Sequence, residues 1–294
     1  MYNLFPMDTK ALQFEARFSL PPNFLGYCGR EIASEKFKEC ITHGKCKGVG
    51  DEVKHFIVLY PYLETIAKIT KFPVFSYEVI ESYWIGNDLL KKVKPEDYDL
   101  LLKNFEKQGV PDFFVAELRK KKPKVFIPNH LFQVLHVGVG RASGAVPFNL
   151  KSINNCMIRW GEVVKLIDGK AIINLHSLHR FNPSQPPLIR GGAQILAGVS
   201  LQLAPEHSEA DCKSAPAESE GVSIARNDNK EYTLVVKKEV IPLDHELVPG
   251  LKTGDIVAAH WNMVVKILSK QEVDNLFFWT KEVLRGITYT AHVV

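Results

Sequence analysis

Two residues in the second half of the chain, Cys156 and His260, have side chains that can bind a metal or serve as nucleophile and base. Cys156 stands just before a run of strand-forming residues, in which Gly161 lets the backbone bend. His260 ends a second such run, which follows the turn Gly254-Asp255. Either role requires the thiol to lose its proton. We expect Cys156 and His260 to form a metal-binding or partner-binding site; the plainer alternative is that both are buried structural residues.

Three further residues, Cys28, His130 and His136, are candidates for a site between the two halves of the chain. Cys28 lies in Leu25-Gly26-Tyr27-Cys28-Gly29, which predicts a turn where the backbone approaches another group closely. His130 and His136 are predicted to lie on one strand, where a spacing of six residues places them on the same face. They can line an interdomain pocket with Cys28, or simply form backbone hydrogen bonds at the seam.

A separate candidate for zinc is the sequence Cys40-x-x-His43-x-x-Cys46, which has three ligand types at short spacing and needs a fourth. His55 is the nearest additional ligand. The alternative is a helix end and turn, because glycines and lysines interleave there. The chain has five cysteines at irregular spacing, and this odd number predicts free thiols rather than a disulfide framework.

The elements that position these residues differ between the two halves. From about residue 11 to 114, apolar residues recur every three or four positions, as in helices that bury one face. Pro61 must kink or break one of these stripes, Ser76 is placed to cap the next, and Pro95 opens a third. This pattern predicts a helical bundle domain over residues 1–124.

The second half has the composition of strands. Residues 125–150 are rich in valine, leucine and phenylalanine and predict a connecting strand segment. Short β-branched runs follow, with a hairpin signal at Asp168-Gly169 and a polar stretch over about 205–230 that predicts a mobile loop. Ser269 is placed to cap a C-terminal helix. The predicted fold class is α+β: a helical bundle, then a small OB-like β-barrel with a C-terminal helix over residues 151–294.

Three blocks of this second half resemble the HypC/HupF family, small barrel chaperones of nickel–iron hydrogenase maturation. They are Cys156-x-x-x-Trp160-Gly161, Asp168-Gly169-Lys170-Ala171 and Gly254-Asp255-Ile256-Val257-x-x-His260. The resemblance implies a HypC-like barrel in which Cys156 helps carry an iron bearing cyanide and carbonyl ligands and His260 assists. It also implies protein partners, namely the maturation factor HypD and the hydrogenase large subunit. Trp160 stands where that family usually has proline, and Cys156 is internal rather than next to the chain start.

The whole chain also resembles an uncharacterised prokaryotic protein family with no assigned activity. Four blocks carry this resemblance: Leu25 to Gly29, Tyr83 to Asn87, Asn154 to Gly161 and Gly254 to Trp261.

The composition limits the classes of partner. At 46% hydrophobic and 24% charged residues, the chain has the average makeup of a globular protein, and its net charge of +4 is mild. Its basic run, Arg119 to Lys124, is typical of a solvated helix end, so we expect no nucleic-acid partner. The sequence shows neither an apolar stretch of bilayer length nor a signal peptide, so we expect no membrane partner and a cytoplasmic location.

The sequence lacks a phosphate loop, a nucleophile elbow and a zinc-protease helix motif, which argues against the common enzyme classes. We therefore expect an accessory or maturation protein, linked to hydrogenase assembly, that presents Cys156 and His260 to a metal fragment and docks protein partners. Iron is the expected metal, ahead of zinc. The first alternative is an enzyme with a Cys/His site at the domain interface that acts on a small molecule. The second is a non-catalytic binding module.

Overall fold

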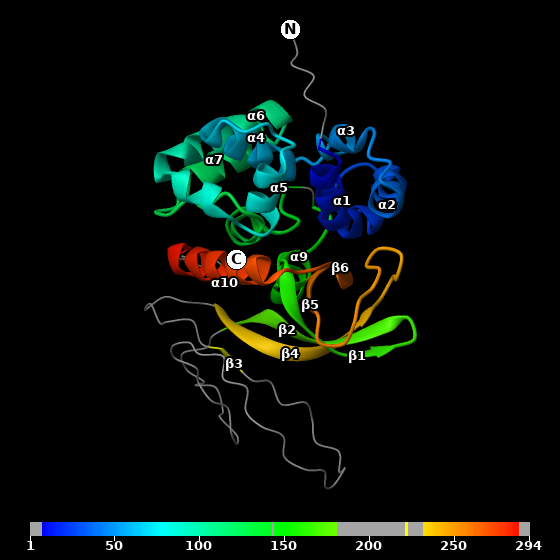
Figure 1. Ribbon diagram of the computed structural model, residues 1–294. Helices are drawn as coiled ribbons and strands as arrows, with labels where there is room; N and C mark the ends of the chain where they lie inside the picture. Colours follow the sequence, from blue (N-terminus) through cyan, green and yellow to red (C-terminus); the bar gives the residue numbers. More distant parts are fainter. Residues whose placement is uncertain (1–7, 143, 181–220, 223–231, 288–294) are drawn as a thin grey trace.

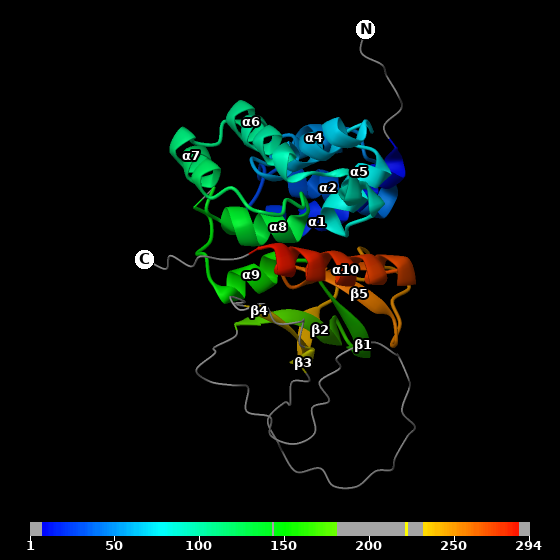
Figure 2. The same ribbon diagram turned by 90° about the vertical axis from the view of Figure 1, so that its left-hand side faces the viewer.

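The computed structural model describes residues 8–142, 144–180, 221–222 and 232–287 and has an α+β architecture. The N-terminal helices form one layer and an antiparallel sheet forms another (Figure 1). Helices α9 (Leu150–Cys156) and α10 (Lys270–Gly286) lie between these two layers (Figure 2). No helix among the described residues combines the length and apolar character needed to cross a membrane.

The N-terminal layer is helical, as predicted. Its elements are α1 (Thr9–Phe24), α2 (Ala33–His43), α3 (Val49–Val53), α4 (Leu59–Thr70), α5 (Tyr77–Trp84), η1 (Asp88–Lys92), η2 (Pro95–Asp97), α6 (Tyr98–Gln108), α7 (Asp112–Lys120), α8 (His130–Phe132) and the π-helical turn η3 (Gln133–Gly138). Ser76 caps α5 by accepting a hydrogen bond from the backbone N–H of Val79, and Pro95 opens the turn that leads into α6. Pro61 lies in the first turn of α4, where a proline removes no helical hydrogen bond.

The segment 125–150 does not form a strand, and that prediction is wrong. Its apolar residues form α8 and η3 instead, and Asn129 caps this helix with its side-chain oxygen 2.9 Å from the backbone nitrogen of Phe132. A continuous apolar run suits a buried helix as well as a buried strand, so the pattern alone could not separate them. The predicted arrangement of His130 and His136 on one strand face is therefore wrong as well.

The sheet contains the strands β1 (Arg159–Ile167), β2 (Lys170–Arg180), β3 (Gly221–Val222), β4 (Tyr232–Pro242), β5 (Ile256–His260) and β6 (Met263–Ile267), in the order β3-β4-β2-β1-β5-β6. All neighbouring strands are antiparallel. Asp168-Gly169 joins β1 to β2, with Ile167 paired to Lys170, as the hairpin signal predicts. Trp261 and Asn262, both with positive φ, form the corresponding turn between β5 and β6.

The strands do not form the predicted OB-like β-barrel. In the described part of the chain, β3 and β6 are the two edges of an open sheet. Strands need not close into a barrel when helices cover their apolar face, and here α9 and α10 lie against the sheet (Figure 2). The predicted mobile loop over about 205–230 falls outside the described residues, except for the short strand β3.

The C-terminal helix is as predicted. Ser269 and Glu272 form a capping box at the start of α10: Ser269 accepts from the backbone N–H of Glu272, and the carboxylate of Glu272 accepts from the backbone N–H of Ser269. The buried apolar residues of the helical layer and the sheet form one cluster. The division of the chain into domains at residue 124 stays a prediction.

Candidate metal-binding site

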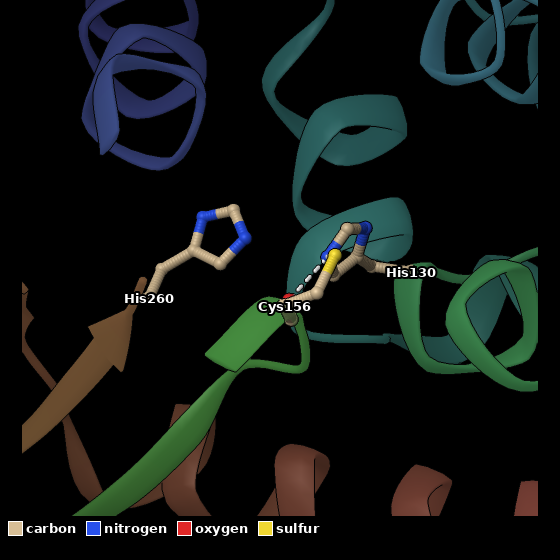
Figure 3. Close-up of side chains that lie close together, drawn as sticks. All are labelled: His130, Cys156 and His260. Carbon is tan, nitrogen blue, oxygen red and sulfur yellow. Dashed lines mark hydrogen bonds between the residues drawn. The ribbon is translucent and has the colours of Figure 1, made fainter. Parts of the chain in front are cut away.

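The structure brings His130, Cys156 and His260 together at the junction of the helical layer and the sheet. His130 is the first residue of α8, Cys156 is the last residue of α9, and His260 is the last residue of β5. One nitrogen of each imidazole and the sulfur of Cys156 all lie within 4.8 Å of one another, and the three side chains converge from separate elements (Figure 3). All three residues are buried, with exposed fractions of 4%, 8% and 1%.

His130 is held through both of its ring nitrogens. Nδ1 lies 2.9 Å from the hydroxyl of Tyr83, and Nε2 lies 2.7 Å from the carbonyl oxygen of Cys156 and 3.7 Å from its sulfur (Figure 3). That carbonyl oxygen can only accept, so in the metal-free protein Nε2 carries the proton and donates to it. Binding a metal through Nε2 requires the other tautomer, in which Nδ1 donates to Tyr83 and Tyr83 donates to the side-chain oxygen of Gln133.

His260 has one satisfied and one unsatisfied nitrogen. Its Nδ1 lies 2.7 Å from the carbonyl oxygen of Phe18, which can only accept, so Nδ1 carries the proton. The lone pair therefore lies on Nε2, which is fully buried and makes no hydrogen bond, although the backbone carbonyl of Cys156 is near enough to influence the pKa of the ring. A buried polar atom without a partner is rare in folded proteins, and a missing ion or water is a common reason for it.

Burial keeps all three groups neutral. It lowers the pKa of His130 to about 4 and that of His260 well below its usual value. Burial also raises the pKa of the Cys156 thiol well above its usual value, and Cys28 acts in the same direction. The indole N–H of Trp261 opposes this rise, although it does not reach hydrogen-bonding geometry with any partner. Both imidazoles are thus neutral, and Nε2 of His260 presents a lone pair, whereas the thiol must lose a proton to bind a metal.

More than half of the chain matches a known protein family. Residues 7–185 match the profile of a family of unknown function, DUF6390. The chain belongs to this family. The matched region includes His130 and Cys156 but not His260, which lies further along the chain. No curated protein and no solved structure matches the chain significantly. The relation to HypC/HupF stays a prediction.

Trp84 connects a buried carboxyl group, that of Glu15, to the two histidines of this DUF6390 protein. Trp84 packs against His130 and His260, with ring centroids 4.5 and 5.5 Å apart, and its indole N–H donates to Glu15 at 2.9 Å. The hydroxyl of Ser19 donates to the other oxygen of Glu15 at 2.6 Å. Burial raises the pKa of Glu15 to about 7, so this carboxyl group titrates near neutral pH.

Neither Glu15 nor Trp84 was predicted from the sequence as part of the site. A signal for Glu15 was present, because it lies on the same face of α1 as buried apolar residues and four residues before Ser19. Trp84 was assigned only to an apolar stripe, and its contact with the two imidazoles depends on elements that are distant in sequence.

Apart from Cys28, the remaining candidate residues do not belong to the cluster of His130, Cys156 and His260. His136 accepts from or donates to the hydroxyl of Tyr98 at 2.8 Å and is not part of the cluster. Cys40 and Cys46 are joined in a disulfide, so neither offers a thiolate, and the prediction of free thiols is wrong for this pair. His43 is exposed at the end of α2, where Gly44 has φ 69°, which matches the helix end and turn rather than a zinc site.

Proposed function

We propose that this protein is a metal-binding accessory protein that holds one transition-metal ion with His130, Cys156 and His260. The observation that carries the proposal is Nε2 of His260, a buried lone pair with no partner beside a second imidazole and a thiol. A divalent cation at this point would satisfy that lone pair. It would also favour the thiolate form of Cys156, whose charge burial otherwise opposes.

The donor set fits a borderline metal. Two imidazoles and one thiolate suit zinc, iron(II), nickel or copper better than magnesium or calcium. Three protein ligands leave one further position to be filled in a four-coordinate site. The finer form of the proposal is transfer of an iron fragment during hydrogenase assembly, supported by the motif positions of Cys156 and His260.

A metal role fits the site better than a nucleophilic role for the thiol. A catalytic cysteine works as a thiolate and has a lowered pKa, but burial raises the pKa of Cys156. The three side chains are also buried too completely to meet an organic substrate without rearrangement. An ion needs only the small space between three converging donor atoms (Figure 3).

The test is elemental analysis of protein purified without oxygen. The wild type is compared with Cys156→Ala, His260→Gln and a Cys40→Ser/Cys46→Ser control. We expect one metal per chain in the wild type and the control, and none in the other two variants. Metal retained in both site variants, or no metal in the wild type even after addition of zinc or iron(II), would exclude the proposal. Infrared bands of carbonyl and cyanide ligands would distinguish an iron fragment from a simple ion.

A further inference from the structure

The loop between α1 and α2 places a fourth metal-binding residue next to the three buried ones. Cys28 in this loop is exposed to solvent, whereas Cys156 is buried. Loss of hydration nevertheless raises the pKa of the Cys28 thiol to about 12. Because the residue is exposed, contact with water makes this rise smaller than burial alone would. A negative charge on Cys28 would raise the pKa of both Cys156 and Tyr83, so Cys28 lies within electrostatic reach of the candidate site.

Two sets of contacts hold this loop beside the site. The ring of Tyr27 packs on that of Trp261 with centroids 4.6 Å apart, so the neighbour of Cys28 touches the neighbour of His260. On the other side, the side-chain amide of Asn23 donates to the carbonyl oxygens of Cys28 and Arg30 at 2.7 and 2.8 Å. The loop that carries Cys28 is thereby tied both to the end of α1 and to the turn that follows His260.

The net charge of the ion and its ligands favours a second thiolate ligand. A divalent ion bound by Cys156 and two neutral imidazoles leaves a net charge of one positive unit in a buried place, which is costly. A second thiolate makes the ion and its ligands neutral, and two thiolates with two imidazoles form a set common in four-coordinate zinc sites. Nε2 of His260, buried and without a partner, already indicates that an ion is missing from this cluster.

We propose that Cys28 is the fourth ligand of the metal held by His130, Cys156 and His260, and that it forms the solvent-facing side of the site. This inference rests on the proposed function. Cys28 is not among the donor atoms that lie within 4.8 Å of one another, so the loop must move inward when the ion binds. Gly26, with φ of 72° and no atom within 4 Å of where a Cβ would lie, gives the backbone before Cys28 the freedom to do so. Each thiol releases one proton to solvent as its sulfur bonds to the ion.

Cobalt(II) titration tests this directly, because charge transfer from sulfur to cobalt reports the number of bound thiolates. The full-length wild type is compared with Cys28→Ser, Cys156→Ser, His260→Gln and the Cys40→Ser/Cys46→Ser control. We expect Cys28→Ser to show about half of the charge-transfer intensity of the wild type, because one of two thiolates is lost. Its cobalt affinity should fall by more than the roughly 10- to 100-fold expected for an outer-shell change. The control should match the wild type.

Differential alkylation gives a second, site-specific readout. With an excess of maleimide, Cys28 should be labelled in the metal-free protein and protected after zinc is added, as read by peptide mass spectrometry. Two outcomes would overturn the role of Cys28 and leave the proposed function standing. One is equal labelling of Cys28 with and without zinc. The other is an unchanged cobalt spectrum and affinity in Cys28→Ser while Cys156→Ser and His260→Gln lose the metal. Cobalt bound as in the wild type by both Cys156→Ser and His260→Gln would instead overturn the proposed function.

Discussion

Burial acts in opposite directions on the carboxyl group and on the imidazoles around the candidate site. It raises the pKa of Glu15 and lowers those of His130 and His260, because the charged form of each group loses its hydration. Trp84 connects these groups by donating to Glu15 while packing against both imidazoles. Below about pH 7, the metal-free site therefore combines neutral donors with a protonated carboxyl group, and none of these groups carries a buried charge.

The first prediction concerns Glu15→Gln. The carboxyl group has a pKa of about 7 in the folded state and a reference value of 4.5, so the folded state holds its proton more tightly than the unfolded state does. The free energy of unfolding therefore falls as pH rises from 4.5 to about 7, and this loss of stability persists at higher pH. The amide of the substituted glutamine keeps an oxygen acceptor for Trp84 and does not ionise. We expect the variant to be more stable than the wild type at about pH 8, by up to about 3 kcal/mol, and nearly equal at about pH 4.5.

Urea unfolding of the metal-free wild type and variant at both pH values measures this difference. A stability difference that does not change with pH would show that Glu15 does not titrate in the range given by its burial.

At the scale of elements, the sequence predicted two helix caps and a hairpin turn correctly, because each depends on interactions between residues close in the chain. Ser76, Ser269 and the turn Asp168-Gly169 each act within a few residues, and each lies where its cap or hairpin was expected. The run around His130 was predicted as a strand because apolar content alone does not separate a buried strand from a buried helix.

For the candidate site, the sequence indicated Cys156 and His260 as a pair and His130 separately. Their convergence could not be derived, because it depends on how α8, α9 and β5 pack together. The same limit applies to the open sheet, which local strand signals cannot distinguish from a closed barrel.

Gly161 illustrates a constraint that only the packed strands reveal. The sequence suggested that this glycine lets the chain bend, but in the structure a Cβ atom there would lie 1.8 Å from the backbone oxygen of Asn174 in β2. We expect Gly161→Ala to destabilise the chain by several kcal/mol or to prevent folding, because a backbone atom must move. Gly169→Ala is the matched control. Its Cβ meets nothing within 4 Å, so only the positive φ of 63° should cost about 1 kcal/mol.

Chemical unfolding of both glycine variants, followed by circular dichroism, checks this prediction. Similar stability losses in the two variants would mean that β1 and β2 can separate locally to accept the methyl group at position 161.

At the scale of the whole molecule, the candidate site lies where the helical layer and the sheet are joined. The carbonyl oxygen of Phe18 in α1 accepts from His260 in β5, and Arg17 donates to the backbone of Leu247 and of Val265 in β6. The buried apolar residues of the two parts also belong to one cluster. An ion held by α8, α9 and β5 would therefore link the two layers rather than stabilise one of them.

The last prediction follows from this position. An ion that binds only the folded state at a free concentration of 100 times its Kd stabilises that state by about 2.7 kcal/mol. For a chain of this size, a gain of 1 kcal/mol raises Tm by roughly 2 °C, so zinc should raise Tm by about 5 °C. Because the ligands come from both layers, the whole unfolding transition should shift as one, as seen by calorimetry and by tryptophan fluorescence. His260→Gln, with one of the ligands removed, should show little or no shift. A shift confined to one of two separate transitions would mean that the ion stabilises a single layer and that the layers unfold independently.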